Sequence, residues 1–141
     1  MKDAVRHVYV HTPFCRRKCP YCDFYSVEDT GDDATRQRYF DALAVELRLV
    51  TQEERIAAAR PPETLYLGGG TPSLVEPRSF GPVLEVLGIP PGGSRDIEFS
   101  VELNPDSATP ARVAALAALD ANRFSLGVQS FEDKALARLG R

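Results

Sequence analysis

The chain has 141 residues, of which 43% are hydrophobic and 26% charged, and its formal net charge is −3. This length fits about one domain, over residues 1–141, and the composition can bury a core. The charge gives no sign of a nucleic-acid or membrane-surface binder, and no apolar run approaches the length of a transmembrane helix or a signal peptide. Because the three cysteines are an odd number, they indicate a reducing compartment, and we expect a soluble cytoplasmic protein.

The first half of the chain predicts a strand, a long helix and a second strand. His7–Thr12 is a β-branched and aromatic run ended by a proline, which is typical of a strand. A helix is predicted from Thr35 to about Ala59, capped by Asp32 or Asp33, because apolar residues recur there at helical spacing. These residues are Tyr39, Phe40, Leu43, Leu47 and Val50, and we interpret the two aromatic ones as core. Thr64–Leu67 is the second predicted strand.

The second half continues the alternation. An apolar stripe predicts a helix from Phe80 to Gly88, and alternating residues predict a strand over Asp96–Leu103. An alanine-rich helix follows Thr109-Pro110, a fourth strand covers Arg123–Val128, and Ser130–Asp133 resembles a capping box. That box would open a last helix with Leu136 and Leu139 inward. Right-handed crossovers between such elements make a parallel sheet, so the predicted class is α/β.

All three cysteines fall within one short segment. Cys15, Cys19 and Cys22 are separated by three residues and then two. Thiolates are soft ligands for iron–sulfur clusters, zinc or copper(I), and three are one short of a closed zinc site or a fully ligated cubane cluster. A missing fourth ligand would leave one metal position open for a substrate. The alternatives are a Cys3His zinc site that recruits His7 or His11, and ordinary buried thiols, which the tight spacing disfavours.

The basic run Arg16–Lys18 lies between the first two cysteines. Its simplest interpretation is a solvated loop face. The same cations would also lessen the negative charge of a thiolate-ligated cluster.

Polar or glycine-rich motifs follow the other predicted strands. Gly68–Pro72 follows the second strand, and its three glycines let the backbone approach a ligand closely, although a plain turn is the alternative. The segment matches neither a Walker loop nor GxGxxG. Glu102 and Gln129 end the third and fourth strands. Because sites in βα architectures collect at the carboxyl ends of the strands, we expect all these motifs at one edge.

Taken together, the motifs resemble the radical S-adenosylmethionine (SAM) superfamily, whose signature is Cys-x3-Cys-x2-Cys with an aromatic residue before the third cysteine. Within it they are most similar to the oxygen-independent coproporphyrinogen III oxidase and HemW haem-chaperone family. The likeness is carried by Tyr9–Cys15, Cys19–Phe24, Gly68–Ser73, Val101–Pro105 and Arg123–Phe131. It implies the N-terminal four βα units of a partial (βα)6 barrel, and a chain that corresponds to about the N-terminal third of family members.

The resemblance also implies a site. Cys15, Cys19 and Cys22 would hold a [4Fe–4S] cluster whose open iron binds SAM. The residues implied to contact SAM are Tyr9, Tyr21, Gly69, Gly70, Thr71, Glu102, Gln129 and Arg141. An electron from the cluster would cleave SAM to a 5′-deoxyadenosyl radical, so an electron donor is an implied partner. The other implied partner is haem or coproporphyrinogen, and no catalytic side chain is assigned.

The two branches of this family differ in chemistry. In the oxidase branch the radical takes a hydrogen from a coproporphyrinogen propionate, and decarboxylation follows; HemW is instead thought to bind haem and deliver it. The oxidase branch carries a further cysteine two residues after the third cluster cysteine, where this chain has Phe24. This difference favours the HemW-like branch. His7 and His11 are not assigned as haem ligands. A zinc-stabilised α/β domain without radical chemistry is the alternative.

Overall fold

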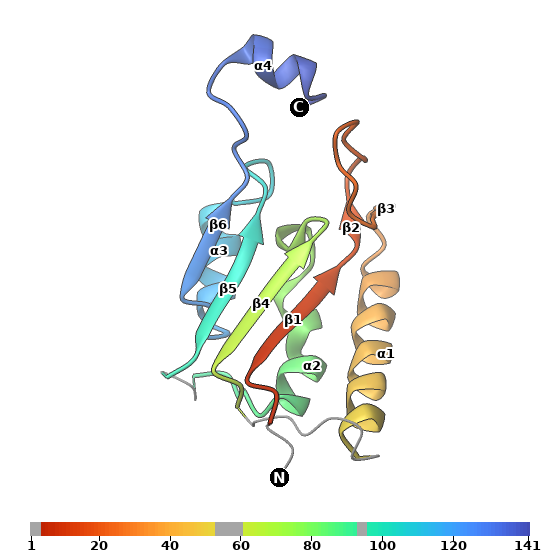
Figure 1. The fold of residues 1–141 in the computed structure, drawn as a ribbon, viewed down its shortest axis with the longest axis vertical. Coiled ribbons are helices and arrows are strands. Elements are labelled where there is room, and N and C mark those ends of the chain that lie inside the picture. Colours follow the sequence, from red (N-terminus) through yellow and green to blue (C-terminus); the bar gives the residue numbers. More distant parts are fainter. Residues whose placement is uncertain (1–3, 53–60, 93–95) are drawn as a thin grey trace.

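The computed structural model describes residues 4–52, 61–92 and 96–141. Its main sheet is parallel, with strand order β1-β4-β5-β6 (Figure 1). The strands are β1 (His7–Thr12), β4 (Thr64–Gly69), β5 (Glu98–Leu103) and β6 (Arg123–Leu126). The α/β class with a parallel sheet is therefore confirmed. No helix in the described ranges is long and apolar enough to cross a membrane.

Helices cover one face of the sheet. These are α1 (Asp33–Gln52), α2 (Gly81–Val86) and α3 (Pro110–Ala117), and α2 and α3 lie behind the strands in Figure 1. Side chains that alternate along the strands pack against the helices. Core residues include Val10, Leu65, Leu67, Phe99 and Val101 from the strands and Phe40, Phe80, Leu84 and Leu116 from the helical segments. Burial of this apolar surface holds the sheet to its helices.

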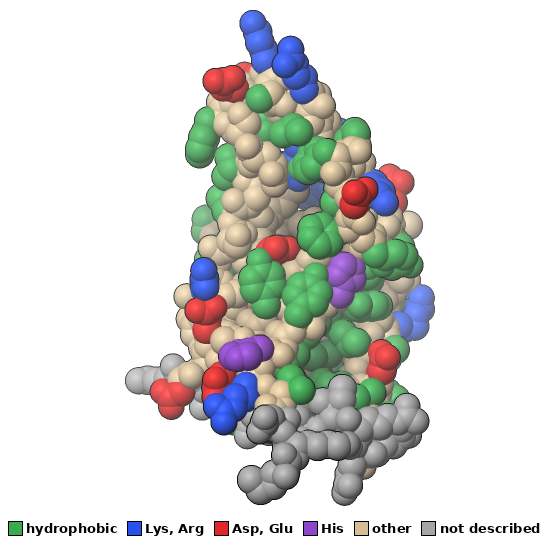
Figure 2. All heavy atoms as spheres, in the orientation of Figure 1, with side chains coloured by type: hydrophobic (Ala, Val, Ile, Leu, Met, Phe, Trp, Pro, Cys, Tyr) green, Lys and Arg blue, Asp and Glu red, His purple; other side chains and the backbone are tan. Residues whose placement is uncertain are grey.

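The other face of the sheet is open in the part of the chain that the structure describes. Apolar and aromatic side chains gather on it together with acidic groups and histidines (Figure 2). Tyr9 on β1 is 53% exposed there, whereas its neighbour Val10 is 5% exposed and points to the helices. The short helix α4 (Asp133–Arg138) stands beyond the carboxyl ends of the strands (Figure 1).

The first helix begins two residues earlier than predicted, at Asp33. Asp32 accounts for this start, because its carboxylate accepts hydrogen bonds from the Ala34 amide (3.0 Å) and the Thr35 hydroxyl (2.5 Å). The bond from Thr35, followed by that from the Ala34 amide, lowers the pKa of Asp32. The predicted continuation over residues 53–59 lies outside the described residues.

Three other predicted boundaries differ. The stripe predicted to start a helix at Phe80 opens instead with a 3₁₀ turn, η2 (Pro77–Phe80), and β5 starts at Glu98. Strand β6 ends at Leu126, because the Val128 amide turns back to donate to the Leu126 carbonyl (2.9 Å). The predicted capping box is wrong. Helix α4 starts after Glu132, and the Ser130 hydroxyl accepts from the Glu132 amide (3.1 Å), so it lies two residues too early to cap the helix.

Two very short strands were not predicted. They are β2 (Phe14–Cys15) and β3 (Val27–Glu28), which pair in parallel and close the segment that carries the cysteines. The pairing is extended by a bond from the Asp29 amide to the Cys15 carbonyl (2.7 Å). We call the enclosed segment, residues 15–27, the cysteine loop. A two-residue ladder has too little pattern to be recognised from the sequence.

Candidate functional site

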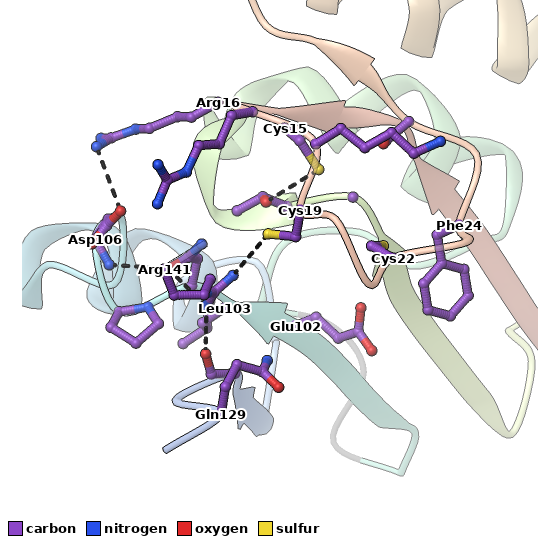
Figure 3. A pocket seen from close by; sticks show the side chains of 18 of the residues that line it. Cys15, Arg16, Cys19, Cys22, Phe24, Glu102, Leu103, Asp106, Gln129 and Arg141 are labelled. Atoms are coloured by element: carbon purple, nitrogen blue, oxygen red, sulfur yellow. Dashed lines mark hydrogen bonds and ion pairs between the residues drawn. The ribbon is translucent and has the colours of Figure 1, made fainter. Parts of the chain in front are cut away.

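A pocket of about 670 Å³ lies at the carboxyl ends of the strands (Figure 3). Its walls come from the cysteine loop, from Gly68–Pro72 at the end of β4 (the glycine segment), from the ends of β5 and β6, and from α4. All the predicted site residues except Tyr9 line it. They are Cys15, Cys19, Tyr21, Cys22, Gly69, Gly70, Thr71, Glu102, Gln129 and Arg141. The motifs that were expected at one edge of the sheet therefore meet there.

The three cysteines are free thiols of intermediate exposure around this pocket. The Thr71 hydroxyl points at the Cys15 sulfur (3.7 Å), and an Arg141 nitrogen points at the Cys19 sulfur (4.0 Å). Among the described residues, no three Cys, His, Asp or Glu side chains could hold one common ion. A zinc ion needs its ligands around one centre, whereas each cysteine of a cubane cluster binds a different iron.

Neither histidine of the zinc alternative turns toward the thiols. The Nδ1 atom of His7 lies 3.0 Å from the Thr64 hydroxyl on the neighbouring strand. The Nε2 atom of His11 lies 2.8 Å from the Tyr25 carbonyl, which can only accept a hydrogen bond. His11 Nδ1 therefore accepts from the Tyr9 hydroxyl, 3.0 Å away. Both rings are engaged on the open face of the sheet.

The glycine segment packs against the start of the cysteine loop. The Gly70 amide donates to the Thr12 carbonyl (2.7 Å), and a Cβ on Gly70 would lie 2.7 Å from the carbonyl oxygens of Thr12 and Phe14. Gly69 has a φ of +108°, and a Cβ there would lie 2.5 Å from the His11 ring. The close approach that these glycines permit is thus first of all an approach to the chain's own backbone and side chains. Their contact with a ligand stays a prediction.

Glu102 is oriented by two hydrogen-bond donors, one for each oxygen. Oε1 accepts from the Tyr66 hydroxyl (2.7 Å), and Oε2 accepts from the Gly69 amide (3.1 Å). Burial first, and then the bond to Glu102, raises the pKa of Tyr66 to about 12. Tyr66 was not predicted as a site residue. The one available signal was strand alternation, which places it on the same face of the sheet as Gly68.

Tyr9 is the predicted residue that the structure does not bring to the pocket. Its ring stacks on Tyr66, with ring centroids 6.0 Å apart and an interplanar angle of 25°, on the open face of the sheet. Burial, followed by the charge of Glu102, raises the pKa of Tyr9. The alternation that points Val10 into the core points Tyr9 away from it. The contact of Tyr9 with SAM stays a prediction.

Arg141 closes the pocket from the α4 side. Its guanidinium donates to the Gly127 carbonyl (2.7 Å) and lies 3.5 Å from the Asn104 amide oxygen (Figure 3). With the cations of Arg16–Lys18 it gives the pocket more positive than negative side chains, since the acidic lining residues are Glu102 and Asp106. This surplus suits a bound group of negative charge, such as a thiolate-ligated cluster.

Tyr21 and Gln129 also line the pocket. Tyr21 is 46% exposed, and burial followed by the charge of Cys19 raises the pKa of its hydroxyl. Gln129 has a φ of 67°, in the left-handed region, at the turn that leaves β6. This turn redirects the chain toward α4, and so it contributes to the placement of Arg141.

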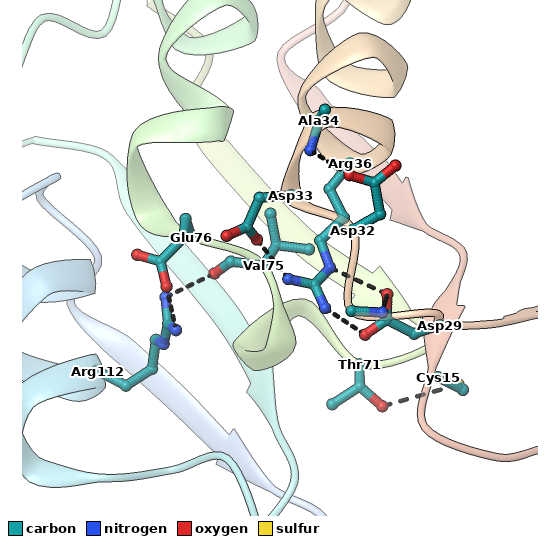
Figure 4. Close-up of polar contacts among 11 residues, drawn as sticks. Cys15, Asp29, Asp32, Asp33, Ala34, Arg36, Thr71, Val75, Glu76 and Arg112 are labelled. Carbon is teal, nitrogen blue, oxygen red and sulfur yellow. Dashed lines mark hydrogen bonds and ion pairs between the residues drawn. The ribbon is translucent and has the colours of Figure 1, made fainter.

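A nearly buried ion pair anchors the return of the cysteine loop (Figure 4). The Arg36 guanidinium donates to both carboxylate oxygens of Asp29 and to Asp33 (2.5 Å). The side chains of Arg36 and Asp29 are only 11% and 7% exposed. Hydrogen bonding to Asp29 is the main cause that raises the pKa of Arg36. The pair fastens the end of the loop to the first turn of α1.

Replacing Asp29 with asparagine should lower the free energy of unfolding by about 2 kcal/mol, because it leaves a nearly buried guanidinium short of a charged partner. The matched control is Glu63→Gln, which breaks the exposed Arg6–Glu63 pair (2.7 Å). An exposed pair contributes at most about 1 kcal/mol. Urea unfolding followed by circular dichroism gives both values. Equal losses in the two variants would contradict an anchoring role for Asp29.

The chain was compared with curated proteins. It is 38% identical over 135 residues to the mitochondrial radical S-adenosyl methionine domain-containing protein 1 of Bos taurus, covering 95% of this chain and 29% of that protein. It is 37% identical to the heme chaperone HemW of Synechocystis, covering 94% of this chain and 32% of the relative, and 34% identical to HemW of Escherichia coli, covering 95% and 34%. The chain thus spans about a third of the length of these relatives.

A solved structure has the same fold. The coproporphyrinogen III oxidase HemN from Escherichia coli, described as a radical SAM enzyme, superposes with a TM-score of 0.77 at 26% sequence identity. The match covers 98% of this chain and 31% of HemN. The sequence model of the Radical SAM superfamily matches residues 9–141, from β1 through all three cysteines to Arg141. The chain therefore belongs to the radical SAM superfamily.

Proposed function

We propose that the chain is the cluster- and SAM-binding part of a HemW-type haem chaperone. The observation that carries this proposal is the gathering of the three cysteines, Glu102 and Arg141 around one pocket. These residues fit a [4Fe–4S] cluster and SAM. When bound, the reduced cluster supplies the electron that cleaves SAM to a 5′-deoxyadenosyl radical.

The cysteines, Glu102 and Arg141 would each have a different role in binding the cluster and SAM. Cys15, Cys19 and Cys22 would hold three irons and leave the fourth for SAM. Glu102, whose two oxygens are already oriented by protein donors, would accept hydrogen bonds from the polar hydrogens of SAM. Arg141 would lessen the negative charge beside Cys19, from which it is 4.0 Å away.

Two observations support the haem-chaperone branch. Relatives named heme chaperone HemW match nearly the whole chain at 33–37% identity. Phe24, which lines the pocket and is 61% exposed, stands where the oxidase branch carries its further cysteine. The second candidate is a coproporphyrinogen III oxidase, which the structural likeness to HemN supports.

Haem transfer and decarboxylation by the full-length gene product distinguish the two candidates. The protein is purified anaerobically and given haem and an apo-haem protein, and separately given coproporphyrinogen III with SAM and a reductant. We expect haem to be bound and passed on, and coproporphyrinogen to stay unchanged in the chromatogram. Decarboxylation of coproporphyrinogen would contradict the chaperone proposal and establish the oxidase.

A further inference from the structure

Tyr66 connects the open face of the sheet to the pocket. It lies on β4, two residues before Gly68, and its hydroxyl donates to Glu102 on β5 (2.7 Å). A carboxylate on a sheet surface can adopt several orientations, and a short charge-assisted bond from a neighbouring strand selects one of them. Tyr66 is not itself among the residues that line the pocket.

We propose that Tyr66 is a positioning residue of the cofactor pocket, which holds the Glu102 carboxylate in the orientation that meets SAM. The identity of the ligand rests on the proposed function, whereas the bond between Tyr66 and Glu102 does not. With one donor on each oxygen, the carboxylate is fixed at both ends while half of its lone pairs stay available for a ligand.

The Tyr66–Glu102 pair explains why residue 68 is a glycine. A Cβ on Gly68 would lie 2.7 Å from Cε1 of the Tyr66 ring and 3.0 Å from Oε2 of Glu102. Any side chain at Gly68 would therefore displace the tyrosine, the carboxylate or both. Among the three consecutive glycines, Gly68 makes room for the Tyr66–Glu102 pair, Gly69 for the His11 ring, and Gly70 for the backbone of residues 12–14 just before the cysteine loop.

The tyrosine ring is itself held in place before any ligand binds. Tyr9 stacks on it from β1, and the Tyr9 hydroxyl is fixed by His11, which in turn donates to the Tyr25 carbonyl of the cysteine loop. The hydrogen-bond donor to Glu102 is thus preorganised by a chain of contacts that begins in the cysteine loop. Preorganised donors lose little conformational entropy when they bind.

The bond can be tested without cluster or SAM. The titratable and charged groups that face Tyr66 are Tyr9 on β1, Glu102 on β5 and Arg123 on β6. Glu102→Gln removes the negative charge beside Tyr66 and leaves at most a hydrogen bond to a neutral amide oxygen, so the Tyr66 pKa should fall from about 12 toward its ordinary value of 10.0. The matched control is Glu98→Gln, a carboxylate on the same strand that pairs with Arg123 (2.8 Å) and does not touch Tyr66.

Tyrosine-selective ¹³C NMR near pH 11, with circular dichroism to show that each variant is folded, reads out the ionisation of Tyr66. We expect Tyr66 to be ionised to a greater extent in Glu102→Gln than in the parent chain or in Glu98→Gln, whose Tyr66 signals should agree with each other. Equal ionisation in the two variants would overturn the proposal at its first step.

The second measurement is SAM affinity of the anaerobically reconstituted protein. Tyr66→Phe keeps the ring and its stack but removes the donor, and it should weaken SAM binding on the order of tenfold. Tyr39→Phe is the matched control, because it removes a hydroxyl that donates to the His11 carbonyl (2.7 Å) outside the pocket, and it should leave the affinity unchanged. In a Glu102→Gln background, Tyr66→Phe should have no further effect.

A merely structural role of Tyr66 would weaken SAM binding equally with and without Glu102, and that result would contradict the proposal. Failure of the parent protein to bind SAM would instead contradict the proposed function. The NMR measurement on the metal-free chain would still decide whether Tyr66 holds Glu102.

Discussion

Replacing Cys19 with serine is expected to abolish the iron–sulfur cluster, so that iron, labile sulfide and visible absorbance fall to background after anaerobic reconstitution. A serine hydroxyl is a hard, protonated group at neutral pH and does not replace a soft thiolate on iron. No spare thiol exists to compensate, because the chain has only three cysteines and all line the pocket. The same loss is expected for Cys15→Ser and Cys22→Ser.

The control for this loss is Tyr25→Ser in the same loop. Tyr25 is 72% exposed and lies three residues beyond the last cysteine, so a serine there changes the loop without removing a predicted ligand. This variant should keep its iron and sulfide. An unchanged iron and sulfide content in Cys19→Ser would mean that this cysteine is not a ligand of the cluster.

Gly70→Ala should lower the free energy of unfolding by about 3 kcal/mol and reduce the yield of reconstituted cluster. The added methyl group would lie 2.7 Å from two carbonyl oxygens, those of Thr12 and Phe14. Both are backbone atoms at the junction of β1 with the cysteine loop, so no side-chain rotation can relieve the overlap. The chain must move the loop away from the sheet, which also separates Cys15 from Thr71.

Gly81→Ala is the matched control for this prediction. A Cβ on Gly81 meets no atom within 4 Å, and the residue opens α2, where alanine has the higher helix propensity. Urea unfolding should show this variant to be as stable as the parent or more stable. If Gly70→Ala unfolds at the same urea concentration as Gly81→Ala, the contact between the glycine segment and the cysteine loop does not stabilise the chain.

Those parts of the fold and site that depend on local pattern could be predicted from the sequence. The alternation of Phe99, Val101 and Leu103 predicted β5, and all three side chains are buried as that pattern requires. The same alternation placed Glu102 on the other face. Because every strand of the sheet is parallel, the motifs after each strand reached one edge, and the pocket formed where they meet.

The features that were missed depend on how segments pack together in space, which no local sequence pattern specifies. Tyr66 and Glu102 are 36 positions apart, and only the register of β4 against β5 brings them together. The Arg36–Asp29 pair depends on how the cysteine loop returns to α1, which no local pattern specifies. Tyr9 was placed at the pocket through family resemblance, and the structure instead places it on the open face of the sheet.

Electron paramagnetic resonance of the dithionite-reduced, reconstituted chain, recorded with and without SAM, tests the central claim most directly. We expect a [4Fe–4S]⁺ signal whose g values change when SAM is added, because an iron without a cysteine ligand is then taken by the cofactor. The same change should be absent when buffer without SAM is added instead. A cluster signal that does not change when SAM is added, or a preparation that binds one zinc and no iron, would contradict the assignment of this pocket as a cluster- and SAM-binding site.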